Sequence, residues 1–182
     1  MSVVMKAIPV TSLESVLTNV DDEGFDVMAH CVMNNMSLCV RDLIKSGCVA
    51  AKDWQNSDDG GNLLHLAVQH GVSVKILDSL IGAAVSIRHE NCENIAPIHY
   101  AARYGHCDLL NVLAPLSVDL RDSREGMTAV HYAAKYGRRV CVEILMKHGH
   151  HLDSKNNDGK TPVDIAPSSL GVWISSRLAD LH

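Results

Sequence analysis

The stretch that decides the fold runs from residue 126 to residue 137 and reads Gly-Met-Thr-Ala-Val-His-Tyr-Ala-Ala-Lys-Tyr-Gly. Residues 94–105 are close to it, as Asn-Ile-Ala-Pro-Ile-His-Tyr-Ala-Ala-Arg-Tyr-Gly, and residues 60–71 form a looser copy, Gly-Gly-Asn-Leu-Leu-His-Leu-Ala-Val-Gln-His-Gly. A fourth copy begins at Gly159 with Lys-Thr-Pro-Val-Asp-Ile-Ala. The shared histidine stands at 65, 99 and 131, so its spacings are 99 − 65 = 34 and 131 − 99 = 32. Self-similarity at a period of about 33 residues predicts a stack of repeated supersecondary units.

The positions of this pattern have physical reasons. Thr just before a helix can cap it, and Pro in the first turn has a preset φ and no N–H to leave unpaired. The Ala-Ala pair lets two helices approach closely, and Gly ends the first helix in a left-handed conformation. The pattern therefore predicts first helices at about 63–70, 97–104 and 129–136, each followed by a more apolar second helix at about 74–82, 107–114 and 139–148.

The composition is that of a globular domain of closely packed helices. Apolar residues make up 47% of the 182 residues and charged residues 20%, which argues against disorder. Aromatic residues make up 4%, too few for a typical β-sandwich. The segment 1–60 carries nine acids and four bases, which leaves 21 − 9 = 12 acids and 16 − 4 = 12 bases in the rest. Without a basic footprint for a phosphate backbone, we expect no nucleic-acid partner.

No targeting or membrane segment is evident in the sequence. The first residues lack the long apolar core of a signal peptide, and no stretch approaches the roughly 18 apolar residues of a membrane span. We therefore expect no membrane insertion and a location in the cytoplasm or the nucleus.

We expect four repeats between two capping segments. The first repeat is degenerate, because aligning Gly24 with Gly126 puts Ala29 in the place of the histidine and Asn35 in that of the helix-ending glycine. After Ala166 the pattern stops, and a last helix with a polar outer face closes the stack. The predicted division is a capping segment at 1–20, repeats at 21–56, 57–90, 91–122 and 123–155, and a partial capping repeat at 156–182.

These residues resemble the ankyrin repeat, whose signature is Thr-Pro-Leu-His-x-Ala and whose period is about 33 residues. Residues 161–162 are its opening Thr-Pro, residues 97–99 keep its middle as Pro-Ile-His, and residues 128–131 are Thr-Ala-Val-His. The resemblance covers about residues 21–182. It implies an all-α solenoid of helix-turn-helix units joined by β-hairpin-like loops, with the motif histidine linking adjacent turns by hydrogen bonds. It also implies non-catalytic recognition of another protein through a concave face, as in a regulatory adaptor or inhibitor.

The histidines and cysteines have structural explanations. In a solenoid, His65, His99 and His131 lie roughly 10 Å apart, too far to share a metal ion. The six cysteines contain no Cys-x-x-Cys pair and mostly take apolar helix positions. The sequence His-Gly-His-His at 148–151 falls on a turn, where we expect a solvated loop. With no phosphate loop, nucleophile elbow or zinc-protease helix either, we predict no catalytic residue, no metal ligand and no cofactor.

Candidate partner contacts follow from the family pattern, which places them beside the motif glycine and just before the helix-ending glycine. Two neighbouring repeats each put a cation directly before a tyrosine there, and both residue types are enriched at binding hot spots. Three apolar side chains are expected at hairpin tips, where polar residues are usual. The predicted partner-binding residues are Phe25, His70, Ile95, Arg103, Tyr104, Arg124, Met127, Lys135 and Tyr136. Cations beside aromatic rings suit a partner segment that carries acidic or phosphorylated residues next to an apolar anchor.

Two other functions remain open at this point. The chain could be the ankyrin module of a larger channel, scaffold or ubiquitin-ligase adaptor. A protein of another class, a metal or redox sensor, would draw on the histidine cluster and the cysteines, and a metal analysis with a thiol count would distinguish it. The sequence does not name the partner.

Overall fold

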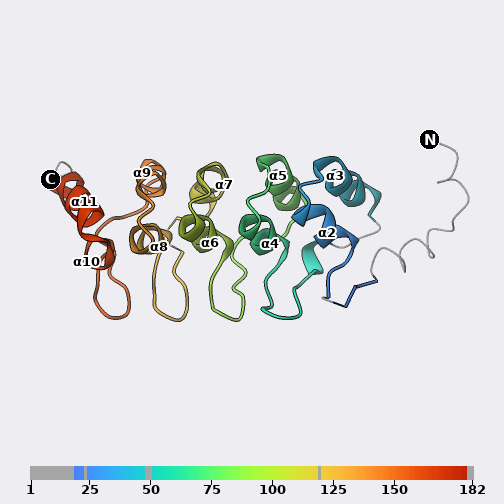
Figure 1. The fold of residues 1–182 in the computed structure, drawn as a ribbon, viewed down its shortest axis with the longest axis horizontal. Coiled ribbons are helices and arrows are strands. Elements are labelled where there is room, and N and C mark those ends of the chain that lie inside the picture. The colour runs from blue at the N-terminus through green and yellow to red at the C-terminus, as the bar shows by residue number, and fades with distance from the viewer. Residues whose placement is uncertain (1–18, 23, 48–50, 119, 180–182) are drawn as a thin grey trace, which may run out of the picture.

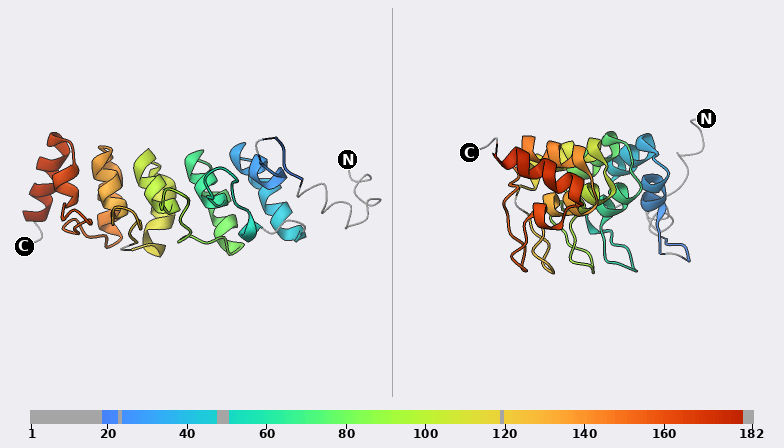
Figure 2. Two further views of the ribbon diagram at one scale, coloured as in Figure 1. Left: turned by 90° about the horizontal axis from the view of Figure 1, so that it is seen from below. Right: turned by 60° about the vertical axis from the view of Figure 1, so that its left-hand side comes forward.

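The protein is a single row of helix pairs. The computed structural model describes residues 19–22, 24–47, 51–118 and 120–179. Two parallel layers of helices run along the molecule, and long loops extend from one layer to the same side of it (Figures 1 and 2). All but the last two residues of the predicted capping segment at 1–20 lie outside the described residues. In the described part, all regular elements are helices, as the all-α prediction requires.

The first helix of each pair lies in the layer beside the loops, which we call the inner row. The inner row comprises α2 (Val27–Met33), α4 (Leu63–Gln69), α6 (Pro97–Tyr104), α8 (Ala129–Lys135) and α10 (Pro162–Ile165). The outer row comprises α3 (Ser37–Ser46), α5 (Val74–Gly82), α7 (Cys107–Leu113), α9 (Arg139–Lys147) and α11 (Ser168–Ala179). Two short 3-10 helices, η1 (Ala51–Asp53) and η2 (Ala114–Leu116), complete the described elements. These bounds match the predicted first and second helices to within one or two residues, and the exact repeat boundaries stay a prediction.

The loops between pairs are hairpin-like rather than sheet-forming. Isolated antiparallel bridges join Gln55 to Asn62 and Arg121 to Thr128 across two of them. The loops run side by side beneath the inner row (Figure 2). They therefore present one continuous face together with the exposed sides of the inner helices.

The core is built from the small residues of the repeat and the apolar residues of the outer helices. Ala101, Ala102, Ala133 and Ala134 are all fully buried, and α6 packs directly against α8. A larger side chain at these positions would push the two inner helices apart. This burial confirms the predicted register of the two best-preserved repeats.

Left-handed residues end several helices, as the pattern predicts. Asn35 replaces the expected glycine with φ = 56°, and Ala84 stands at φ = 60° in the turn after α5. Asn tolerates this conformation and Ala does not, so Ala84 is a strained position. Pro115 ends α7 at Leu113 and turns the chain into η2. Proline has no N–H with which to continue the α-helix, so α7 is short.

Candidate partner-binding surface

Three buried histidines connect successive repeats. His65, His99 and His131 are at most 3% exposed. Each Nδ1 accepts a hydrogen bond from the backbone N–H at the start of its own helix, at 3.1–3.2 Å. Each Nε2 lies near a carbonyl oxygen of the next loop, that of Ile95 (2.8 Å), Leu120 (3.2 Å) or Lys160 (3.1 Å). The predicted structural role of these histidines is confirmed.

The two bonds fix the protonation of the His99 and His131 rings. A nitrogen that accepts from a backbone N–H carries no proton, so Nε2 of these two rings carries the proton and donates to the carbonyl. Burial lowers the pKa of His65 to about 4 and that of His99 to about 4, and it also lowers the pKa of His131. The rings are therefore neutral at pH 7, and their burial separates them from solvent.

A second periodic series, missed by the sequence analysis, organises the loops. Asp122 accepts hydrogen bonds from the backbone N–H groups of residues 124–127. Asn91 and Asn156 bind the backbone N–H groups of their own loops in the same way. Asn56 and Asp21 take the equivalent places earlier in the chain. An Asn or Asp thus recurs once in each repeat at an equivalent place, and this recurrence could have revealed the series.

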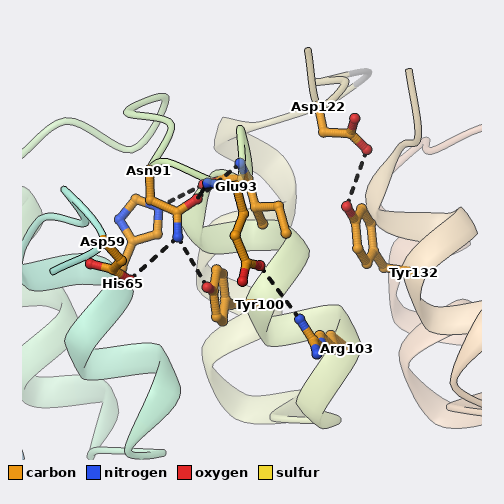
Figure 3. A network of polar contacts seen from close by, with 9 residues as sticks. Asp59, His65, Asn91, Glu93, Tyr100, Arg103, Asp122 and Tyr132 are labelled. Atoms are coloured by element: carbon orange, nitrogen blue, oxygen red, sulfur yellow. Dashed lines mark hydrogen bonds and ion pairs between the residues drawn. The ribbon is translucent and has the colours of Figure 1, made fainter. Parts of the chain in front are cut away.

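Tyrosines of the inner helices fasten two of these loops. The Asn91 amide donates to the Tyr100 hydroxyl at 3.0 Å, and the Tyr132 hydroxyl donates to Asp122 at 3.2 Å. Figure 3 shows both tyrosines reaching from their helices toward the loop residue. Burial and the nearby Asp122 carboxylate raise the pKa of Tyr132, so its hydroxyl stays protonated. The loop at 91–95 and the loop at 122–127 are thus held firmly against α6 and α8.

An open hollow of about 170 Å³ lies between these two loops and the ends of α6 and α8. We call it the groove. Its lining contains three cations and two carboxylates, and six of the nine predicted partner-binding residues are part of it. The lining residues are Glu93, Ile95, Arg103, Arg124, Glu125, Met127, Tyr132, Lys135 and Tyr136.

Arg103 lies between two tyrosines, of which Tyr136 is part of the groove lining and Tyr104 is not. Its guanidinium carbon lies 5.8 Å from the ring centre of Tyr104 and 5.2 Å from that of Tyr136. Its Nη1 is 3.8 Å from a carboxylate oxygen of Glu93 (Figure 3). We expected two separate cation–tyrosine pairs, and the structure instead has one arginine between tyrosines of neighbouring repeats. The two rings remain 38% and 40% exposed.

The expectation that Ile95 and Met127 are exposed at hairpin tips is wrong. They are 6% and 2% exposed and belong to the core. The backbone N–H of Ile95 is bound by Asn91, and that of Met127 is bound by Asp122, which turns each side chain inward. They line the floor of the groove instead of projecting from it.

Phe25, His70 and Tyr104 are not part of the groove lining, although Tyr104 contacts it through Arg103. Phe25 is half-buried and stacks on Trp54, with ring centres 6.3 Å apart. His70 is exposed at the end of α4, two units away from α8. The structure therefore groups the predicted contacts of repeats three and four and leaves these two on earlier repeats.

We expected the His-Gly-His-His sequence at 148–151 to form a solvated loop, but one of its histidines is buried. His150 is 5% exposed, and its Nε2 lies 3.1 Å from the carbonyl oxygen of Ala114. It is thus another buried link between neighbouring units, and only His151 of the three histidines is fully on the surface. Among the described residues, no three His, Cys, Asp or Glu side chains are grouped so that they could hold a metal ion.

Comparison with known proteins agrees with the architecture. The family model described as "Ankyrin repeats (3 copies)" matches residues 28–122 and again residues 98–172. The chain belongs to the ankyrin-repeat family. This family consists in general of non-catalytic modules that bind other proteins. Among the described residues, no helix of this ankyrin chain is long and apolar enough to cross a membrane.

Two curated proteins are similar to the ankyrin repeats of this chain. The "Nuclear factor NF-kappa-B p105 subunit" of Mus musculus is 34% identical over 128 residues, which is 67% of this chain. The "Ankyrin repeat protein nuc-2" of Neurospora crassa is 30% identical over 127 residues, or 68% of this chain. The matched segments span only 13% and 12% of these relatives, so the likeness concerns the repeat region and not the whole proteins.

Proposed function

We propose that this ankyrin protein is a non-catalytic regulatory adaptor or inhibitor that binds a segment of another protein in the groove. The observation that carries the proposal is the groove itself, an open hollow with three cations and the exposed Tyr136 in its lining and the exposed Tyr104 beside it. Tyr and Arg are the residue types that most often dominate binding energy at protein interfaces. We propose that the protein acts in the cytoplasm or the nucleus.

The charges of the groove support a partner segment that is acidic or phosphorylated. Arg103 is partly balanced by Glu93, whereas Arg124 and Lys135 are exposed on the two sides of the hollow. A carboxylate or phosphate between them would gain charge-assisted hydrogen bonds. An apolar side chain next to it would cover Tyr136, which is exposed in the lining. A strongly acidic segment without an apolar anchor would leave this tyrosine uncovered.

The test is a comparative pull-down from cell extract, read by mass spectrometry. The parent protein, Tyr104→Ala and Tyr136→Ala serve as baits, and Arg88→Glu is the control, because Arg88 is exposed and lies outside the groove. We expect at least one protein to be captured by the parent and the control and lost from both tyrosine variants. Truncating a central anchor should cost about 2 kcal/mol or more, which is about 30-fold in affinity. If all four baits, shown to be folded, recover the same proteins, the groove is not the binding site.

A variant of Arg124 tests whether the partner segment is acidic, because this charged side chain is exposed in the groove lining. Arg124→Glu should mainly slow association with the captured protein and change its salt dependence. An unchanged association rate at low salt would argue against an acidic or phosphorylated partner segment.

An alternative proposal is that the chain serves as the ankyrin module of a larger channel, scaffold or ubiquitin-ligase adaptor. It is supported by the two relatives, in which the matched region is a small part of a longer protein. A transcript that continues in frame past His182 would favour this alternative. The groove would then deliver a bound segment to the other domains.

A further inference from the structure

Two cysteines from neighbouring repeats meet on the outer row. Cys107 is the first residue of α7, and Cys141 lies in the first turn of α9, 34 residues further along the chain. Their sulfur atoms are 3.7 Å apart. The helices that carry them pack directly against each other. A disulfide bond is about 2 Å long, so the sulfurs would have to approach by less than about 2 Å, which side-chain rotation can supply.

The pair is open to small reagents from one side. An open hollow of about 330 Å³ is lined by both cysteines, by Gly105 and Gly137, and by the consecutive arginines at 138–139. Cys107 is partly exposed, whereas Cys141 is 1% exposed. A peroxide entering the hollow therefore reaches Cys107 first.

A 3.7 Å contact with Cys107, and not its acidity, places the buried partner for the second step of an oxidation. Burial, the largest cause, and the neighbouring Cys107 raise the pKa of Cys141 to about 12, while the charge of Arg138 acts in the opposite direction. Cys141 thus keeps its proton at neutral pH and does not react first. It remains in contact with Cys107, where it can attack an oxidised sulfur.

We propose that Cys107 and Cys141 are a redox-active dithiol, which closes to a disulfide when a peroxide oxidises the protein. Cys107 loses its proton and its sulfur attacks one peroxide oxygen, which breaks the O–O bond. The departing hydroxide takes up that proton and leaves as water, and Cys107 is now a sulfenic acid. The Cys141 sulfur then attacks the Cys107 sulfur, and the S–O bond breaks. The hydroxyl group leaves as a second water with the proton of Cys141. Two thiols have lost two protons and two electrons, and one hydrogen peroxide has become two waters.

The disulfide would lock the outer helices of repeats three and four together. It closes a loop of 34 residues, which removes conformational freedom from the unfolded chain. We expect the midpoint of thermal unfolding to rise by roughly 5–10 °C on oxidation and to return on reduction with dithiothreitol. The inference does not depend on the identity of any binding partner.

The experiment uses the full chain, fully reduced, treated with stepwise additions of hydrogen peroxide, then alkylated, digested and mapped by mass spectrometry. The expected main product links the peptide of Cys107 to that of Cys141, with the rise in unfolding midpoint in parallel. Cys107→Ser, at a partly exposed position, should abolish both changes. Cys92→Ser is the matched control, because Cys92 is exposed and lies outside the hollow, and it should leave both changes intact.

Three results would overturn the proposal. The first is that Cys107 and Cys141 are both still alkylated after a peroxide dose that has oxidised Cys92. The main disulfide could instead join another pair, of which Cys31 and Cys39 are the nearest candidates, since their thiols also interact. Lastly, a Cys107–Cys141 disulfide without a higher unfolding midpoint would contradict the locking of the two repeats.

Discussion

The first repeat and the third and fourth repeats have the same backbone plan but use their inner faces differently. In the first repeat, His30 contacts Asp21 at 2.6 Å and the Phe25 ring stacks on Trp54, so these side chains bind one another. In the third and fourth repeats, Tyr136 is exposed in the lining of an open groove, and Tyr104 is exposed beside it. A surface whose side chains already have partners gains little binding free energy from a ligand, because the ligand must replace existing contacts.

The two regions also differ in how they are joined to their neighbours. Buried histidines bind each of the second, third and fourth units to the next loop. The first unit has Ala29 in that place, which cannot form such a bond. One polar link from it to the second unit is the Asn35 side chain, which accepts from the Ser73 N–H at 2.9 Å. We infer that the histidines make the interior of the stack sensitive to acid in a way that its first unit is not.

The largest change in folding stability is expected when the pH is lowered. An unperturbed histidine has a pKa near 6.5, whereas His65 and His99 have values of about 4 in the folded protein. As pH falls from 6.5 to 4, the unfolded chain takes up protons that the folded chain excludes, so stability present above pH 6.5 is lost. The expected loss is about 3 kcal/mol for each of the two histidines. Urea unfolding at intervals of half a pH unit measures it.

His99→Gln isolates one contribution to that acid effect. A neutral amide does not titrate, so the variant should be less stable than the parent at pH 7 and should lose less stability between pH 6.5 and 4. Burial raises the pKa of Asp26, which acts in the opposite direction, but it does so equally in both proteins. Equal slopes for the parent and the variant would show that His99 does not remain neutral in the fold.

Overpacking an interior repeat should have the next largest effect. Ala133 is fully buried beside α6, so Ala133→Leu should cost roughly 1–3 kcal/mol. The equivalent position of the first repeat is Cys31, which is larger and 8% exposed, and Cys31→Leu should cost clearly less. Thermal unfolding compares the two variants. An unchanged midpoint for Ala133→Leu would place that residue outside the helix contact.

The smallest change in folding stability is expected in the turn after α5, which departs from the repeat pattern. Ala84 has φ = 60° where glycine follows the outer helix in the first and fourth repeats. Ala84→Gly should therefore stabilise the protein by about 0.5–1 kcal/mol, because it relieves the left-handed strain. Ala83→Gly, at φ = −84°, relieves nothing and should destabilise it slightly. A loss of stability on Ala84→Gly would contradict this reading of the turn.

The sequence predicted the features that recur with the period. The three histidines, the alanine pairs and the left-handed Asn35 follow from the pattern and lie where it places them. The pattern failed for Ile95, because its orientation depends on how Asn91 binds the loop backbone, which is a contact within the folded loop. It also failed to place Arg103 between two tyrosines, since that arrangement joins side chains of neighbouring repeats through their rotamers.

Binding of the partner is expected to depend on the groove and not on the first repeat. Once the pull-down has supplied a partner, its affinity for Tyr136→Ala and for Phe25→Ala can be compared by calorimetric titration. We predict that Tyr136→Ala weakens binding by about 30-fold or more, while Phe25→Ala, if folded, binds within about twofold of the parent. The reverse order, with full affinity for Tyr136→Ala and a large loss for Phe25→Ala, would contradict the account and place the site on the acidic first repeat.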